Sequence, residues 1–283
     1  MKARKIISFI LAVMFIFSSF SVCCLAATKY NYVVLGDSIA YGSGLLNAKE
    51  ACYGKMVADT CGFNYANHAV PGATTSEFLD ELKDRTIRVD LAKADIVSIS
   101  IGGNDFLNEL SNLMYDSIVR KNYEDFDIIG NGIYTNIKKA IGIILGLSPD
   151  AVILLQTLYN PMTGYLKESY QQAADRVNAA VYRLAKEYPK NVAVVDVDTL
   201  LTGDKENFAD DTLHPTAKGN KKIADEVLSV LRKLGFTKKT KIATNTIGID
   251  VHLGSVVSEP LELYAFFLHA IAKVVNVISL IMK

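Results

Sequence analysis

Ser38 and His214 have the residue types of a nucleophile and its base, and each follows an expected strand. A serine hydroxyl is a weak nucleophile until a neighbouring base takes its proton. Asp211 stands three residues before His214, close enough for its carboxylate to orient the imidazole through Nδ1 and to stabilise the charged ring. Among the four histidines, His214 is the one that we expect beside a carboxylate in a loop after a strand. The strand-end position of Ser38 and the short spacing of Asp211 and His214 are consistent with a triad of these three residues, with the adjacent Asp210 pointing elsewhere.

Short apolar runs alternate with segments of helical period, and these elements must position the triad. The runs are nearly continuous, which is typical of strands buried on both faces of a parallel sheet. Thr74 and Glu77 form a capping box at the start of one helix. Strands that alternate with helices predict a three-layer α/β domain with a central parallel sheet, whose active residues gather at the carboxyl ends of the strands. The expected strands are residues 32–35, 64–70, 95–101, 151–155 and 192–197, and the expected helices are 74–85, 165–188 and 216–234.

Four short blocks fall at the ends of the expected strands. Each block alone is typical of a turn or a loop, but their order and placement are hard to obtain by chance. They are Gly36-Asp37-Ser38, Gly72, Gly102-Gly103-Asn104-Asp105 and Asp211-Thr212-Leu213-His214-Pro215. Together they resemble the blocks of the GDSL/SGNH hydrolase superfamily, over Tyr30 to about Gly235. The resemblance implies a flavodoxin-like α/β/α sandwich that hydrolyses esters, thioesters or acyl groups on carbohydrate.

The same resemblance assigns an oxyanion hole. Attack on an ester carbonyl creates an oxyanion that needs donors fixed in advance. The backbone N–H groups of Ser38 and Gly72 and the side-chain amide of Asn104 fit that role. We expect Gly72 to allow close approach of its backbone to substrate, and Gly102 and Gly103 to allow the turn that aims Asn104.

Other residues near these blocks have structural explanations. His68 lies in the second strand, where a structural role is expected. Asp37 and Asp105 are expected to orient their loops through turn hydrogen bonds. The Gly-x-Ser-x-Gly elbow is absent, because Gly42-Ser43-Gly44 lacks its spacing, which argues against an α/β-hydrolase fold.

The amino terminus has the pattern of a secretory signal peptide, assigned to residues 1–26. Lys2, Arg4 and Lys5 precede an apolar run over 6–22, and small residues follow. An uncleaved anchor and a lipoprotein cysteine are the alternatives, and Val22 before Cys23 disfavours the second. Removing the three basic residues leaves 27 basic and 30 acidic residues, so bulk charge excludes a nucleic-acid binder.

Cys52 and Cys61 remain after processing, and export permits a disulfide. The residues between them form an expected helix, which separates them by about 13 Å, whereas a disulfide needs Cα atoms within about 7 Å. We therefore predict two free thiols. With no CxxC pair and no paired-histidine motif, no metal site is expected, and the triad requires no cofactor.

The chain divides into the signal peptide, a hydrolase domain over 28–236 with a helical insertion at 106–149, and an extension over 237–283. The extension ends in an apolar helix over 261–282. This helix can dock on the core, lie in a membrane surface or span a membrane, and docking beside the active cleft is the preferred interpretation.

Three functions fit the sequence. The first is an extracellular esterase or lipase acting on small acyl esters or lipids, and the apolar tail and insertion favour it slightly. The second is an O-deacetylase of cell-wall or plant polysaccharide. The third, a non-catalytic binding module, is disfavoured by the complete set of Ser38, Gly72, Asn104, Asp211 and His214.

Overall fold

The computed structural model describes residues 29–253 and 258–281. The predicted signal peptide lies outside the described residues. Five parallel strands form one sheet in the order β2-β1-β3-β4-β5, which is the flavodoxin-like order of a doubly wound fold. This confirms the predicted α/β class. The strands are β1 (Asn31–Gly36), β2 (Asn64–Asn67), β3 (Ile96–Ser100), β4 (Val152–Gln156) and β5 (Val192–Val195).

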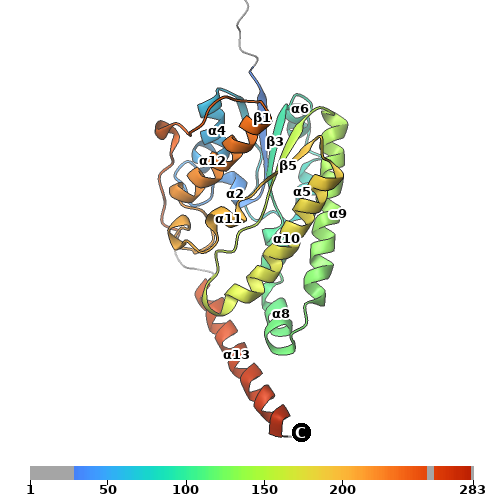
Figure 1. Cartoon of the computed structure of the whole chain (residues 1–283), viewed down its shortest axis with the longest axis vertical. Helices are drawn as coiled ribbons and strands as arrows, with labels where there is room; N and C mark the ends of the chain where they lie inside the picture. The colour runs from blue at the N-terminus through green and yellow to red at the C-terminus, as the bar shows by residue number, and fades with distance from the viewer. Residues whose placement is uncertain (1–28, 254–257, 282–283) are drawn as a thin grey trace, which may run out of the picture.

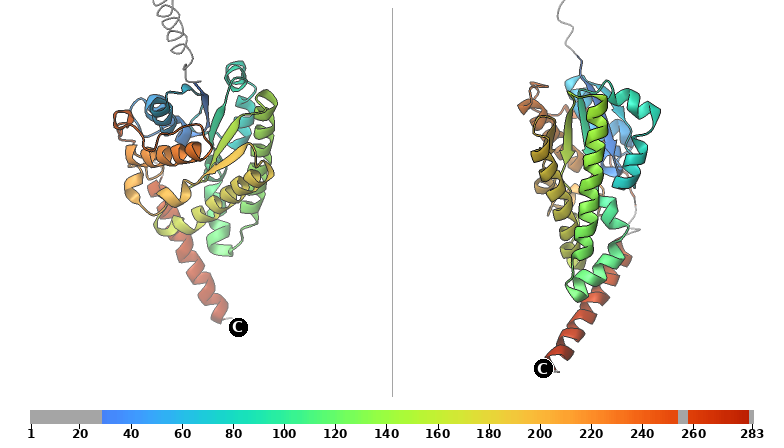
Figure 2. Two further views of the ribbon diagram at one scale, coloured as in Figure 1. Left: turned by 45° about the horizontal axis from the view of Figure 1, so that its top comes forward. Right: turned by 90° about the vertical axis from the view of Figure 1, so that its right-hand side faces the viewer.

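Helices cover both faces of the sheet, as Figures 1 and 2 show. Side chains along β1 point alternately to the two faces of the sheet, which separates two hydrophobic cores. Val33 and Leu35 pack against one helix layer, and Tyr32 and Val34 pack against the other. The first layer contains α5 (Thr75–Glu81), α6 (Arg85–Leu91), α9 (Glu124–Leu147) and α10 (Lys167–Glu187). The second contains α2 (Ser38–Tyr41), α4 (Tyr53–Cys61), α11 (Asp198–Leu201) and α12 (Ala217–Lys233), with α3 (Ala48–Ala51) preceding α4.

Local sequence signals explain several helix ends. The Thr74 hydroxyl accepts from the Glu77 N–H at 3.3 Å, and the Glu77 carboxylate accepts from the Thr74 N–H at 2.9 Å, so the predicted capping box opens α5. Thr216 caps α12 by accepting from the Gly219 N–H at 3.2 Å. The helix expected between the cysteines is α4, and both Cys52 and Cys61 are free thiols. Burial raises the pKa of each thiol.

The segment that follows β3 begins at the carboxyl end of the sheet and is helical. It contains α7 (Gly103–Leu107), α8 (Leu110–Tyr115), the π-helical turn η1 (Asp116–Arg120) and then α9. Further along the chain lie three 3₁₀ turns, η2 (Gly164–Leu166), η3 (Lys205–Asn207) and η4 (Thr244–Thr246), and the last helix, α13 (Ser258–Ile281).

Helix α13 docks on the body through one short face. Ala265 and Leu268 are buried against Leu110, Met114 and Leu166. Beyond this contact the helix extends away from the body, at the end where α8 lies (Figures 1 and 2). Within the described residues, no helix combines the length and apolar character that crossing a bilayer requires.

Candidate active site

Ser38 is placed by a close contact between β1 and β3. Gly36 pairs with Ser100, and the Asp37 N–H donates to the Ser100 carbonyl at 2.9 Å. A Cβ on Gly36 would lie 1.9 Å from that carbonyl oxygen, and its φ of 119° is in the region that favours glycine. The chain can therefore turn sharply after β1 and present Ser38 at the start of α2.

Asp37 lies beneath the nucleophile and is 4% exposed. Its Oδ1 accepts from the Ile39 N–H at 3.0 Å, which caps α2, and from the Ser100 hydroxyl at 3.4 Å. Burial raises the pKa of Asp37 to about 7, although these hydrogen bonds and the nearby His214 oppose the rise. Asp37 thus orients the loop of Ser38, which agrees with its expected turn role.

The two expected oxyanion donors from other strand ends lie next to one another. The Asn104 side-chain amide donates to the carbonyl of Ala73, the residue after Gly72, at 2.9 Å. An amide group carries two N–H donors, so one remains for a substrate oxygen. Gly72 has a φ of 84° and no atom within 4 Å of a built Cβ. This backbone conformation favours glycine, and the space beside it is open for the expected approach of substrate.

Asp105 joins the loop of Asn104 to the start of α5 through hydrogen bonds. Its carboxylate accepts from the Thr75 N–H at 2.9 Å and from the Thr75 hydroxyl at 2.6 Å. The Asn136 amide on α9 adds a bond to the same hydroxyl at 3.1 Å. Burial raises the pKa of Asp105, while its bonds to Thr75 oppose the rise. The loops that carry Gly72 and Asn104 are therefore joined through a partly buried carboxylate.

His214 and Asp211 contact one another as expected. The imidazole Nδ1 contacts Asp211 Oδ2, and Asp211 Oδ1 accepts from the N–H groups of Leu213 at 2.9 Å and His214 at 3.0 Å. Half-burial acts to raise the pKa of Asp211, but the hydrogen bonds from His214 and from the two N–H groups lower it overall. The carboxylate stays ionised and can hold the imidazole in one orientation.

The loop around His214 is held by contacts from distant parts of the chain. Phe208 forms an antiparallel bridge with Pro215, and the Ala209 N–H donates to the His214 carbonyl at 2.8 Å. The Tyr159 hydroxyl donates to the Leu213 carbonyl at 2.8 Å. Burial raises the pKa of Tyr159, so this donor keeps its proton. These contacts fix the backbone that carries the base.

A second support comes from the extension, and sequence reasoning missed it. The Asp250 carboxylate accepts from the Ala217 N–H at 2.5 Å, and the Val251 N–H donates to the Gly44 carbonyl at 3.0 Å. His252 Nδ1 lies 2.5 Å from Asp210 Oδ2. Asp210 therefore points away from the triad, as expected.

The expectation that His214 would be the one histidine beside a carboxylate in a loop after a strand is wrong. His252 pairs with Asp210, and His68 Nε2 lies 2.8 Å from Asp90 on α6. Both pairs join residues that are far apart in the sequence, so local spacing gave no sign of them. His68 follows β2 and contacts α6, which agrees with its expected structural role.

A small pocket at the carboxyl edge of the sheet contains Ser38 and Asn104 and is bordered by Leu213, the residue before His214. Ser38, Asn104, Tyr159 and Leu213 line it, and its volume is about 20 Å³. Within the described ranges, the Ser38 hydroxyl makes no hydrogen bond with the imidazole, which is common for a nucleophile and its base before substrate binds. In the same ranges, no three histidine, cysteine or acidic side chains meet in a metal-binding group.

Comparisons with known proteins identify relatives of this chain and support its fold. Residues 34–222 match the model of the GDSL-like Lipase/Acylhydrolase family. The uncharacterized protein YpmR of Bacillus subtilis (strain 168) is 26% identical over 227 residues, which cover 75% of this chain and 86% of YpmR. The lipase Lip_vut3 from a goat rumen metagenome has a TM-score of 0.62 at 23% identity, covering 74% of this chain and 99% of the lipase. The acetylxylan esterase Axe2 of Geobacillus stearothermophilus, in a catalytic-mutant structure, has a TM-score of 0.52 at 18% identity, covering 74% and 96%.

Replacing Asp37 with asparagine should change the pH dependence of stability. The folded carboxyl has a pKa of about 7, whereas an unfolded aspartate titrates near 4. Between these values the folded state holds a proton that the unfolded chain has released, so stability falls as the pH rises from about 4 to about 7. Asparagine keeps the cap but cannot ionise. We expect the melting temperature of Asp37→Asn, relative to the parent, to rise by a few degrees between pH 5 and pH 8.

Asp84→Asn is the matched control for this prediction. Asp84 caps α6 from the surface, and hydrogen bonds from the N–H groups of Ile87 and Thr86 lower its pKa. Its ionised form is favoured by folding, so the asparagine variant should not gain stability as the pH rises. A parallel change in both variants, measured by differential scanning calorimetry, would contradict the assignment to Asp37.

Proposed function

Because the chain belongs to the GDSL-like Lipase/Acylhydrolase family, we propose that it is a secreted serine ester hydrolase that cleaves acyl esters through an acyl-enzyme on Ser38. One observation carries the proposal. Ser38 and Asn104 line the same pocket as Leu213, and the next residue, His214, contacts Asp211. A nucleophile, a base with its orienting acid and an oxyanion donor thus meet at one edge of the sheet.

We assign one step of the proposed reaction to each group. His214 removes the proton of the Ser38 hydroxyl as its oxygen attacks the ester carbonyl, and Asp211 stabilises the imidazolium. The N–H groups of Ser38 and Gly72 and the free N–H of the Asn104 amide bind the oxyanion. The intermediate then expels the alcohol oxygen, which takes the proton from His214. Water activated by the same imidazole releases the acid and restores Ser38.

A carbohydrate O-deacetylase is the second candidate function. The pocket beside Ser38 has a volume of about 20 Å³, and such a small space favours a short acyl group such as acetyl. The similarity to an acetylxylan esterase adds support at the level of the fold. A non-catalytic binding module remains the least favoured function, since the triad residues and oxyanion donors are all present.

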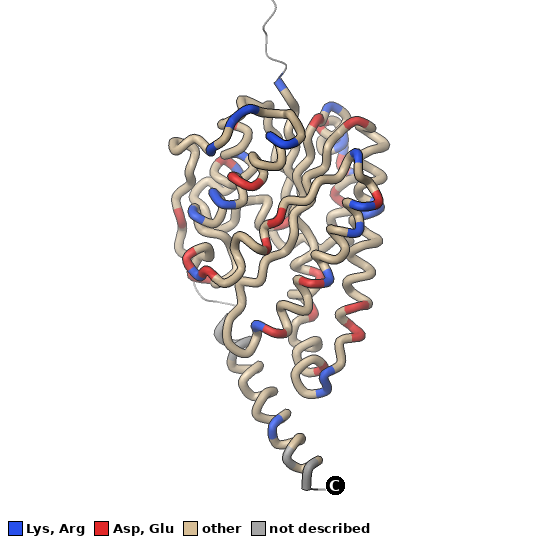
Figure 3. Tube along the Cα trace, viewed as in Figure 1, with Lys and Arg blue, Asp and Glu red and all other residues tan. Residues whose placement is uncertain are grey.

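Export and contact with a membrane surface complete the proposal. The signal-like residues 1–26 support secretion. Between Leu263 and Leu280 the sequence has one charged side chain, Lys273, and Figure 3 shows how little charge α13 carries beyond the body. Ile271, Val274, Val275 and Ile278 are each about half exposed. These four side chains recur at helical spacing along one face of α13, as in an amphipathic helix that lies in a lipid surface.

Ser38→Ala and His214→Ala should each remove nearly all ester hydrolysis, and the double variant should be little worse than either. Triad members act as a unit, so their losses do not add. Steady-state hydrolysis of p-nitrophenyl acetate and p-nitrophenyl butyrate measures the effect. Parent-like activity in Ser38→Ala would remove Ser38 from the role of nucleophile.

Asn104→Ala should lower kcat about 100-fold or more, with a smaller change in KM, because the amide acts mainly on the transition state. Asn136→Ala is a suitable control, since its amide contacts Thr75 and lies outside the oxyanion set. It should leave kcat within a few-fold of the parent. An effect of Asn104→Ala confined to KM would show that this side chain binds substrate in the ground state.

The triple variant Ile271→Ser, Val274→Ser and Ile278→Ser should lose binding to phosphatidylglycerol vesicles in co-sedimentation, by tenfold or more. Burying each large apolar side chain in lipid contributes about 1.5 kcal/mol or more. Hydrolysis of short soluble esters should not change, because the docked residues Ala265 and Leu268 remain. The control replaces three exposed apolar residues elsewhere, Val89, Ile128 and Leu234, and should keep vesicle binding. The proposal would be contradicted if the parent protein does not bind vesicles but forms a dimer, and the triple variant does not form that dimer.

A further inference from the structure

A second, larger pocket lies outside the carboxyl ends of β4 and β5. It has a volume of about 160 Å³, room for a group the size of a benzene ring. One wall is the loop after β4, with Met162, and the other is the segment that leads to His214, with Lys205, Phe208, Ala209 and Thr212. None of these side chains belongs to the triad or the oxyanion set.

This pocket shares a wall with the pocket of Ser38. Thr212 lines the larger pocket, and the next residue, Leu213, lines the smaller one. The Phe208 ring contacts the Tyr159 ring, which lines the smaller pocket, with centroids 5.1 Å apart. The two pockets are therefore neighbours along the histidine loop.

The position of the pocket indicates which half of an ester it takes. The carbonyl oxygen must point toward Gly72 and Asn104, which follow β2 and β3. The leaving oxygen must face the imidazole of His214, because that ring gives it a proton. The larger pocket is built on the loop of His214, so it lies on the side of the alcohol group.

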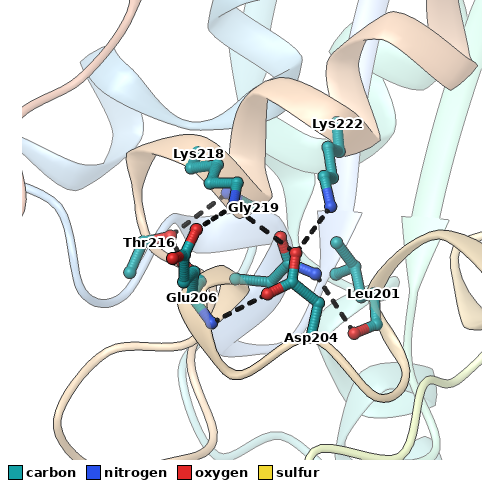
Figure 4. A network of polar contacts seen from close by, with 8 residues as sticks. Leu201, Asp204, Glu206, Thr216, Lys218, Gly219 and Lys222 are labelled. Carbon is teal, nitrogen blue, oxygen red and sulfur yellow. Dashed lines mark hydrogen bonds and ion pairs between the residues drawn. The ribbon is translucent and has the colours of Figure 1, made fainter.

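Lys205 gives the pocket a positive charge that its neighbours do not neutralise. Figure 4 shows the acidic residues on either side, Asp204 and Glu206, directed at lysines of α12. Lys218 contacts Glu206 and lies 3.4 Å from Asp204, and Lys222 lies 3.2 Å from Asp204. Hydrogen bonds from Lys222 are the largest effect lowering the pKa of Asp204. In the described part of the chain, Lys205 has no ion-pair partner.

Both walls of the pocket are held in place by contacts within the chain. The Thr216 hydroxyl donates to the Glu206 carbonyl at 3.0 Å and fixes η3 to α12 (Figure 4). On the other side, Met162 packs against the cluster that contains Leu268 of α13. A preformed pocket loses less free energy when it orders a ligand than a flexible loop does.

From this geometry we propose that the larger pocket binds the alcohol moiety of the substrate, and that this moiety carries an anionic group such as a phosphate beside an apolar part. The apolar part contacts Met162, Phe208 and Ala209, and the anionic group pairs with Lys205. The inference rests on the proposed ester hydrolysis at Ser38 and adds the class of alcohol. Neutral acetylated carbohydrate would leave the charge of Lys205 unused.

The charge is tested with two soluble esters of one acyl group, 1-butyryl-glycerol and 1-butyryl-glycerol 3-phosphate. Lys205→Met should lower kcat/KM for the phosphate ester about threefold to tenfold and leave the neutral ester unchanged. Lys205→Arg should keep the preference, and Lys190→Met, an exposed lysine before β5, should have no effect. Added salt should reduce the preference. An equal change on both esters, or no change, would overturn the anionic assignment.

The size of the pocket is tested by filling it. Ala209→Leu should lower kcat/KM for benzyl butyrate at least fivefold while methyl butyrate, whose alcohol does not reach the pocket, stays near the parent value. Circular dichroism and the methyl ester together confirm a folded variant. Equal losses on the two butyrates would overturn the assignment of this pocket to the alcohol group.

Binding without turnover separates this inference from the function on which it rests. Phenyl phosphate should bind the Ser38→Ala protein, and adding Lys205→Met or Ala209→Leu should raise its dissociation constant at least threefold in calorimetric titration. If the parent protein hydrolyses no ester but these differences in dissociation constant appear, the proposed ester hydrolysis is contradicted and the assignment of the pocket as an anion-binding site is supported. If esters are hydrolysed but the dissociation constants do not differ, the pocket assignment fails.

Discussion

The pairing of β1 with β3 at their carboxyl ends is the contact on which the active site depends. Gly36 and Ser100 lie opposite one another with no room for a Cβ between them. This register places Ser38, two residues beyond β1, beside Asn104, four residues beyond β3. A slip of one residue would turn every side chain of β1 to the other face and would separate the nucleophile from its oxyanion donor.

His214, the proposed base, lies far from Ser38 in the sequence, so its position at the carboxyl edge of the sheet depends on tertiary contacts. The Phe208–Pro215 bridge, the Tyr159 hydroxyl and the Asp250 carboxylate hold the backbone around His214 and the start of α12. The extension therefore supports the active-site loop before it continues to α13. One consequence is that loss of the whole extension would disturb both the catalytic loop and the projecting helix, which is why point substitutions separate these roles better than truncation.

Sequence reasoning predicts the elements here better than their contacts. Strand positions follow from apolar runs, and α5 follows from the Thr74–Glu77 box, because both signals are local. The Asp211–His214 contact was predictable for the same reason, as the residues are three apart. The His252–Asp210 pair, the Asp250 contact and the pocket beside Lys205 join segments distant in sequence, and no local pattern encodes them. Likewise, the apolar period of the tail could not show that α13 docks through Ala265 and Leu268 and leaves Ile271, Val274 and Ile278 exposed.

The central claim is that the acyl group is transferred to Ser38. The most direct measurement is acid quenching of the enzyme during steady-state hydrolysis of p-nitrophenyl butyrate, followed by proteolysis and peptide mass spectrometry. The account predicts a butyryl group on the peptide that contains Ser38, with fragmentation placing it on the serine oxygen, and no such adduct in Ser38→Ala. A butyryl group on another residue that forms and decays at the rate of turnover would contradict it.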